Sequence, residues 1–140
     1  REQTQYVQLI KSSGKQLLAL VNDILDYSKI EANKMTMSLN PLDLTHMMED
    51  LYAVFKLTAD AKDIQLNIDV PDNLPHVQAD SVRLRQILIN LIGNALKFTR
   101  QGSVSIRLKT KVMKNKELQI EFQIEDTGIG IRKEDQARLF

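Results

Sequence analysis

The sequence contains no cysteine among its 140 residues. Disulfide bridges, thiolate metal sites and cysteine nucleophiles are therefore excluded within this chain. It also lacks an excess of either charge, because 19 lysine and arginine residues stand against 18 aspartate and glutamate residues, for a formal net charge of +1. Proteins that bind nucleic acid usually carry a basic excess on one face, so this balance gives no indication of such a partner.

Long hydrophobic runs are also missing. No apolar run approaches the roughly 20 residues that a membrane-spanning helix needs. The first five residues, Arg-Glu-Gln-Thr-Gln, do not have the apolar core of a signal peptide. We therefore expect the chain to begin inside a longer protein.

The first 34 residues contain no proline and predict one long helix from Thr4 to about Lys34. Apolar or small residues recur in alternating steps of three and four, which is the seam of a helix that packs lengthwise against others. Leu18 and Leu25 widen the stripe and favour a bundle over a two-stranded coil. The seam consists of Val7, Ile10, Gly14, Leu17, Val21, Ile24 and Ser28.

A change of pattern follows this helix. The alternation in Met35–Leu39 predicts a short strand, and Asn40-Pro41 predicts a break after it. A second helix is expected from Asp43 or Thr45, either of which can serve as an N-cap, to about Lys62. The residues expected on its inner face are Leu44, Met48, Leu51, Phe55 and Thr58.

The rest of the chain alternates between strand and helix patterns. Apolar residues at every second position predict strands over 64–70, 104–108 and 118–124. Asp80 is expected to cap a third helix that ends near Phe98, and a last helix begins near Lys133. This order predicts helices on one face of a mixed sheet. The core face expected for the third helix comprises Leu84, Leu88, Leu91, Ile92 and Leu96.

Three polar residues of the third helix form the first candidate site. Asn90, Asn94 and Lys97 stand at positions i, i+4 and i+7 and therefore share one face. Amide oxygens are hard ligands suited to Mg²⁺, and a lysine ammonium is a natural counter-charge for phosphate. The same stripe is also compatible with the solvated face of an amphipathic helix.

The second candidate site is Asp126-Thr127-Gly128-Ile129-Gly130, which follows the last predicted strand. A carboxylate at the end of a strand can accept a hydrogen bond from an exocyclic amine, and glycines allow the backbone to approach a ligand closely. A tight turn that leads into a helix would use the same residue types.

Taken together, the two motifs resemble the ATP-binding domain of sensor histidine kinases. Asn90–Thr99 resembles the N box of that family, and Asp126–Ile131 resembles its first glycine box. Asp80–Leu91 is similar to the approach to the N box, and Leu17–Ala32 to the second helix of the dimerisation domain. The resemblance covers essentially the whole chain.

This resemblance implies an α+β fold, in which a long bundle-forming helix is followed by an incomplete two-layer α/β sandwich of the Bergerat (GHKL ATPase) type. Residues 1–34 would be the second helix of the dimerisation and phosphotransfer domain. Residues 35–42 would be a linker strand, and residues 43–140 the first part of the ATP-binding domain.

The resemblance also implies a role for each motif residue, with ATP and Mg²⁺ as the cofactors. Asn90 and Asn94 would hold Mg²⁺ and the phosphates, with Asn94 as the direct ligand. Lys97 would contact phosphate and Phe98 would lie against adenine. Asp126 would accept the adenine amino group, and Thr127 would assist through its hydroxyl or a water. Gly128 and Gly130 would form the floor and hinge of a nucleotide lid.

Two features of the family pattern are missing. The phosphoacceptor histidine should precede an acidic residue and a proline, and neither His46 nor His76 fits. The sequence ends at Arg138–Phe140, where the F box would begin, before the lid. Arg132 also stands where a proline is common in the family. We therefore expect weak nucleotide binding and no autophosphorylation by this chain alone.

The expected partners are a second copy through the long helix, a response-regulator receiver domain, and ATP or ADP, with no nucleic acid. The resemblance also implies the cytoplasmic portion of a membrane-anchored parent protein. Two other hypotheses remain open: another ATPase of the same superfamily, or a non-catalytic dimerisation and docking module with a vestigial nucleotide pocket. Basic residues at Arg107, Lys109 and Lys111 alternate with apolar ones and are better explained as the solvated face of a strand.

Overall fold

The computed structural model describes residues 2–115 and 117–139, and the chain divides into two compact units, Arg1–Met37 and Ser38–Phe140. The division falls within the linker expected from the sequence. Among the described residues, no helix combines the length and apolar character needed to cross a bilayer.

The first unit is dominated by helix α1, Glu2–Glu31. It ends three residues before the expected Lys34, because Asn33 adopts a left-handed conformation with φ of 51°. Asn33 N–H then donates to Ile30 O, and Lys34 N–H donates to Lys29 O, which together form a Schellman motif. The large apolar side chains of the predicted seam are all exposed, by 44% to 71% of their surface.

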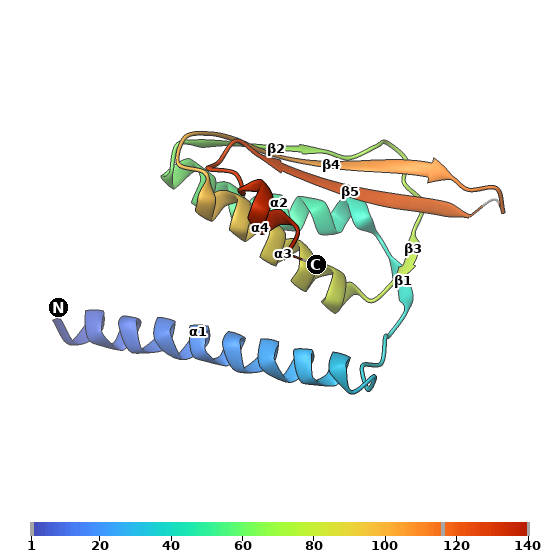
Figure 1. The fold of residues 1–140 in the computed structure, drawn as a ribbon. Coiled ribbons are helices and arrows are strands. Elements are labelled where there is room, and N and C mark those ends of the chain that lie inside the picture. The colour runs from blue at the N-terminus through green and yellow to red at the C-terminus, as the bar shows by residue number, and fades with distance from the viewer. Residues whose placement is uncertain (1, 116, 140) are drawn as a thin grey trace. The chain divides into compact units, whose positions relative to one another are not determined.

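The second unit contains two small sheets and three helices among its described residues (Figure 1). Strand β2 is parallel to β4, and β4 is antiparallel to β5, so this three-stranded sheet is mixed as expected. Strands β1 and β3 pair antiparallel as a separate sheet. The elements are β1 (Asn40–Leu42), α2 (Leu44–Ala61), β2 (Ile64–Asp69), β3 (Val77–Ala79), α3 (Ser81–Phe98), β4 (Gly102–Val112), β5 (Leu118–Asp126) and α4 (Lys133–Gln136).

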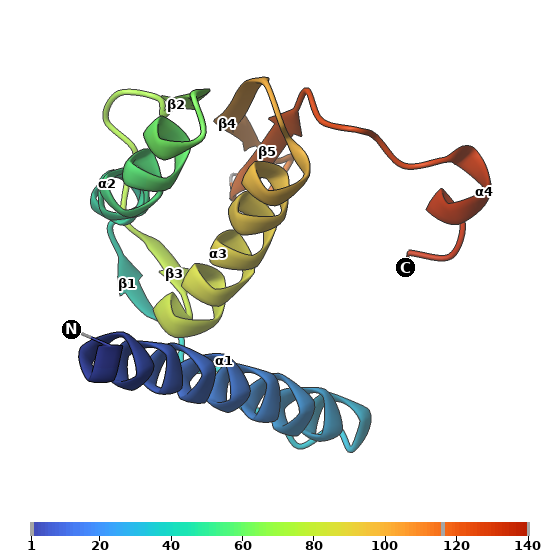
Figure 2. The same ribbon diagram turned by 90° about the vertical axis from the view of Figure 1, so that its left-hand side faces the viewer.

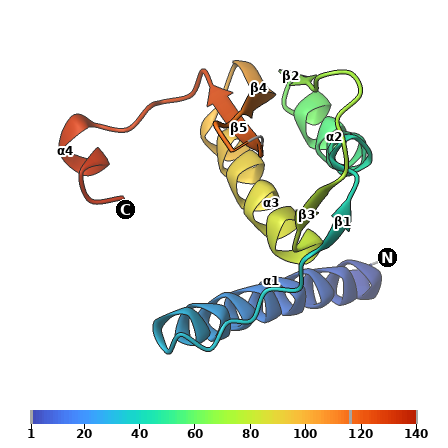
Figure 3. The ribbon, with the colours of Figure 1, turned by 90° about the vertical axis from the view of Figure 1, so that its right-hand side faces the viewer.

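Helices α2 and α3 lie side by side against one face of the sheet, with β2 over α2 and with β4 and β5 over α3 (Figures 2 and 3). Alternation along β4 places Val104, Ile106 and Leu108 in the core, as predicted. The buried apolar residues are Leu44, Met47, Met48, Leu51, Ala59, Ile64, Leu66, Leu88, Ile92, Ala95, Leu96, Val104, Ile106 and Leu108.

Two predictions about the helix faces are wrong. Thr58 is exposed, and Ala59 is buried in its place, because the buried row of α2 continues from Phe55 by a step of four residues. Leu91 is 45% exposed, since it lies on the side of α3 that neither α2 nor the sheet covers. The exposed side of α3 is therefore partly apolar as well as polar.

The linker strand is also placed differently from the prediction. Met35–Leu39 forms no strand, whereas Asn40–Leu42 does, because those three residues pair with Val77–Ala79. Pro41 is tolerated because β1 belongs to a two-stranded sheet and has a free edge that needs no N–H donor. The short partner strand β3 was not predicted.

Both long helices of the second unit begin at an aspartate. Asp43 Oδ1 accepts a hydrogen bond from His46 N–H at 3.1 Å, and Asp80 Oδ1 accepts from Val82 and Arg83 N–H, each at 3.1 Å. These bonds satisfy backbone donors that have no partner within a helix. The cap predicted at Asp80 is confirmed, and α3 ends at Phe98 as expected.

Candidate functional site

The candidate site is built where the end of α3, the start of β4 and the end of β5 meet. Thr127 joins the two strands, because its N–H donates to Ser103 O at 3.1 Å and its Oγ1 accepts from Ser103 N–H at 3.0 Å. Ile129 N–H donates to Phe98 O at 3.4 Å. The segment after β5 is thereby folded back onto the last turn of α3.

Gly128 lies so close to Phe98 that no side chain fits. A Cβ atom at this position would be 2.7 Å from Phe98 O and 2.6 Å from Asp126 Oδ1. Gly102, with a φ of +113°, is equally restricted, because a Cβ there would lie 2.1 Å from Thr127 Oγ1. Gly128 is therefore required by the close approach of the loop to α3, and Gly102 by the packing of the Thr127 side chain on the start of β4.

Asp126 is fixed by the same loop. Its Oδ1 accepts a hydrogen bond from Gly128 N–H at 2.8 Å, which orients the carboxylate at the end of β5. Across residues 2–115 and 117–139, no hydrogen bond is donated to Oδ2. Because Asp126 is exposed, this second oxygen can accept a hydrogen bond from a ligand amine.

Asn90, Asn94 and Lys97 are all exposed on α3. At 3.6 residues per turn they fall within an arc of about 60°. Lys97 Nζ lies over the ring of Phe98, 5.4 Å from its centroid, and the Phe98 side chain is 46% exposed. Two amides, one ammonium and one exposed aromatic ring therefore occupy the uncovered side of α3.

The structure brings some of the predicted residues into contact and leaves others apart. Phe98, Asp126, Thr127 and Gly128 are linked by the loop contacts. Gly130 has a φ of +69°, and a Cβ added to it would meet no atom within 4 Å, so its need for glycine comes from its backbone conformation. No hydrogen bond among the described residues joins Asn90 or Asn94 to the glycine loop.

Two residues near the site were missed by the sequence reasoning. Thr99, directly after Phe98, is fully buried, and its Oγ1 has no hydrogen-bond partner among the described residues. Lys62 Nζ donates to Leu96 O at 2.6 Å and so stabilises the end of α3, where orphan carbonyls gather. Thr99 could have been noticed as the last residue of the N-box pattern, whereas the Lys62 contact spans 34 residues and has no local signal.

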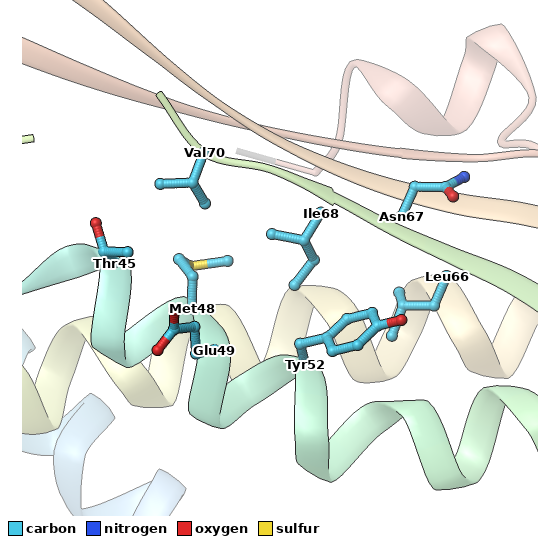
Figure 4. A pocket seen from close by; sticks show the side chains of 8 residues that line it. All are labelled: Thr45, Met48, Glu49, Tyr52, Leu66, Asn67, Ile68 and Val70. Atoms are coloured by element: carbon cyan, nitrogen blue, oxygen red, sulfur yellow. The ribbon is translucent and has the colours of Figure 1, made fainter. Parts of the chain in front are cut away.

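A separate groove of about 590 Å³ lies between α2 and β2, away from these residues. Figure 4 shows Met48 and Tyr52 of α2 directed toward the strand that carries Leu66 and Ile68, with Asn67 on the strand's other side. None of the predicted site residues lines this groove, which is bordered by Thr45, Met48, Glu49, Tyr52, Leu66, Asn67, Ile68 and Val70.

Comparison with protein families gives two matches. Residues 79–140 match the histidine kinase-, DNA gyrase B- and HSP90-like ATPase family, and residues 1–33 match the His Kinase A (phospho-acceptor) domain. The first match includes every residue of the candidate site, and the second covers α1.

Individual relatives agree with these matches. The chain is 38% identical over 139 residues to the signal transduction histidine-protein kinase BarA of Escherichia coli (strain K12), covering 99% of this chain and 15% of that protein. It is 47% identical over 135 residues to the non-motile and phage-resistance protein of Caulobacter vibrioides, covering 96% of this chain and 16% of that protein. The chain thus spans about one sixth of the length of these curated relatives.

Solved structures show the same relationship. The crystal structure of full-length ShkA in complex with AMPPNP superposes with a TM-score of 0.80 at 34% identity, covering 99% of this chain and 29% of that one. The histidine kinase AdeS of Acinetobacter baumannii superposes with a TM-score of 0.72 at 26% identity, covering 87% of this chain and 58% of that one. With both family matches and these relatives in agreement, the chain belongs to the sensor histidine kinases.

Proposed function

We propose that the second unit binds Mg-ATP at the end of α3, and that the protein containing it transfers the γ-phosphoryl group to a histidine. The observation that carries this proposal is the fixed loop of Asp126 and Gly128 packed on Phe98. It presents a carboxylate oxygen, a glycine backbone without a side chain and an exposed aromatic ring. An adenine base can use the first as a hydrogen-bond acceptor, the second for close approach and the third for stacking.

In this site, each residue would act through a group that the structure already orients. Asp126 Oδ2 would accept the adenine amino hydrogen, since Oδ1 is engaged by Gly128 N–H. Phe98 would cover the base with its exposed ring. Lys97, next to that ring, would pair with a phosphate as a point charge.

The amide pair on α3 fits a magnesium ion that is shared with the phosphates. Asn90 and Asn94 expose neutral oxygen donors one helical turn apart, and Mg²⁺ usually combines a few protein oxygens with phosphate oxygens and water. Bound there, the ion would supply charge neutralisation during transfer. Asn94 is the proposed direct ligand.

The proposed reaction is a substitution at phosphorus. The lone pair of a neutral imidazole nitrogen forms a P–N bond to the γ-phosphorus, and the bond to the bridging oxygen breaks. ADP leaves with that electron pair, and the other ring nitrogen releases its proton to a base. We do not assign His46 or His76 as the acceptor. His46 lies beside Glu49 and Asp50, and His76 lies beside Asp43.

The partners are proposed from the same relationships. The phospho-acceptor-domain match over residues 1–33 and the exposed seam of α1 support association with a second copy. A further similar structure, with a fold likeness at 21% identity, is the histidine kinase ThkA in complex with the response regulator TrrA. By analogy, we propose that the phosphoryl group passes on to the aspartate of a receiver domain.

Calorimetric titration of the chain with Mg-AMPPNP tests nucleotide binding. We expect measurable heat with the unsubstituted 140-residue chain, called the parent chain below. Binding by Asp126→Asn should be at least about tenfold weaker, because a charge-assisted hydrogen bond contributes about 1.5–3 kcal/mol. Glu125→Gln is the matched control, since it neutralises the neighbouring exposed carboxylate on β5. Equal affinities for all three proteins would contradict the role of Asp126. An absence of heat with the parent chain would contradict nucleotide binding and favour a docking module.

A further inference from the structure

The segment that joins the two units is held at a defined point. Ser38, the first residue of the second unit, donates its backbone N–H to Asp80 Oδ2 at 3.0 Å. Asn40 Nδ2 holds the same residue by donating to Ser38 O at 3.3 Å and to Ser38 Oγ at 3.1 Å. We call the hydrogen bond from Ser38 N–H to Asp80 Oδ2 the linker clasp.

Asp80 has two separate roles in this arrangement, one for each carboxylate oxygen. Oδ1 caps α3 by accepting from Val82 and Arg83 N–H, while Oδ2 accepts from Ser38 N–H. The side chain is nearly buried, with 8% exposure. A single carboxylate therefore attaches the linker to the first turn of the helix whose last turns carry the proposed nucleotide ligands.

The linker is also anchored at its other end, directly after α1. The Schellman motif fixes the backbone through Lys34, whose N–H donates to Lys29 O at 2.9 Å. Between this anchor and the clasp lie only Met35, Thr36 and Met37. An extended chain spans at most about 3.6 Å per residue, so the four steps from Lys34 to Ser38 reach about 14 Å.

Without the clasp, the next fixed residue would be Asn40, which pairs with Ala79 in the β1–β3 sheet. The free segment would then run from Met35 to Leu39, and the greatest span from Lys34 to Asn40 would rise to about 22 Å. The clasp thus removes about 7 Å from the reach of the linker.

We propose that Asp80 is a positioning residue that sets the length of the hinge between the two units at Met35–Met37. The hinge length itself follows from the contacts of Asp80 with Ser38 and α3. Its consequence rests on the proposed function: a short hinge limits the positions from which a nucleotide on the second unit can approach a histidine beside α1.

Four single substitutions separate this role from helix capping. Ser38→Pro removes the N–H donor and leaves the Asp80 cap intact, whereas Ser38→Ala keeps that N–H and serves as its control. Asp80→Asn retains one oxygen, but whichever way its amide faces, its NH₂ group meets a backbone donor. Asp43→Asn is the control for Asp80→Asn, because Asp43 caps α2 through His46 N–H.

Amide hydrogen exchange on the 140-residue chain, followed by NMR without nucleotide, tests the clasp directly. In Asp80→Asn we expect the Ser38 amide to exchange about tenfold faster or more, which corresponds to the loss of one charge-assisted hydrogen bond. The Ser38 amide should be unchanged in Ser38→Ala and Asp43→Asn. In Asp80→Ala, which removes both oxygens, unchanged Ser38 exchange with faster exchange only at Val82 and Arg83 would show that Asp80 is a cap alone.

Spin-label distances test the hinge length. The chain has no cysteine, so Lys15→Cys in α1 and Lys111→Cys in β4 can be labelled uniquely, with the labelled chain diluted into unlabelled chain. We expect a wider distance distribution for Ser38→Pro and Asp80→Asn than for the parent, Ser38→Ala and Asp43→Asn. Equal widths in all five would overturn the proposal. The nucleotide titration is independent of this measurement, so failure of either proposal can be recognised separately.

Discussion

At the scale of single residues, two glycines should respond in opposite ways to replacement by alanine. We expect Gly128→Ala to destabilise the second unit by about 1–3 kcal/mol and to weaken nucleotide binding, because its Cβ would collide with a backbone carbonyl that cannot move freely. Gly93→Ala, in the middle of α3 with nothing within 4 Å of the added atom, should stabilise by about 0.5–1 kcal/mol. Urea unfolding followed by circular dichroism measures both effects, and destabilisation of similar size by the two variants would contradict this assignment.

Asp80 predicts a pH dependence of stability. Hydrogen bonds from backbone N–H groups hold the pKa of Asp80 below its ordinary value of 3.8. The bond from Ser38 N–H has the largest effect and that from Arg83 N–H the next largest. A carboxyl group whose pKa is lower in the folded state stabilises the fold above its unfolded pKa, and this contribution is lost as the pH falls through the folded value. The advantage of the parent chain over Asp80→Asn should therefore be complete at neutral pH and shrink below about pH 4.

Urea unfolding of both proteins between neutral pH and about pH 2.5 checks the sign of this effect. Asp43→Asn provides a reference for other carboxyl groups. A constant or growing difference between the parent chain and Asp80→Asn on acidification would contradict the assignment.

At the scale of elements, α1 has a surface that needs a partner. Its seam is exposed along the whole helix, and an isolated helix of this kind gains little stability from its own residues. We expect the chain to self-associate in a concentration-dependent manner, and Ile24→Lys to weaken this association by at least about tenfold by placing a charge in the seam. Gln16→Lys, off the seam, is the control. Sedimentation analysis measures the association, and similar behaviour of the two variants would count against pairing through the seam.

Elements with a strong local signal could be predicted from the sequence, whereas those that depend on distant pairing could not. Helix α3 was located at both ends, because an aspartate cap precedes a long periodic segment. Strands β1 and β3 have three residues each, too few for an alternation pattern, and exist through a pairing of residues about forty positions apart. The contact of Ser38 with Asp80 was missed for the same reason.

The candidate site divides in the same way. Helical periodicity alone places Asn90, Asn94 and Lys97 on one face, and the structure shows that this face is exposed. By contrast, the contact between Gly128 and Phe98 depends on the β4–β5 register, in which Val104 lies opposite Asp126. A sequence motif identifies the loop residues. The backbone atoms that these residues approach can be known only from the pairing of β4 with β5.

At the scale of the whole molecule, the two units should respond independently to mutation. The core of the second unit is formed by α2, α3 and the sheet, and Ile92 is fully buried within it. We expect Ile92→Ala to lower the free energy of unfolding of this unit by about 2–5 kcal/mol, the usual result of leaving a cavity in a packed core. Exchange of the α1 amides should be unchanged, because that helix is not part of this core.

Hydrogen exchange in increasing urea, read separately over α1 and over the second unit, measures this independence. Ile24→Lys supplies the converse test, because it should accelerate exchange in α1 and leave the amides of α2 and β4 unchanged. If either substitution instead destabilised both regions together, the units would unfold as one cooperative structure. Such coupling would require the two units to stabilise each other, and the division into two independently stable folds would then be wrong.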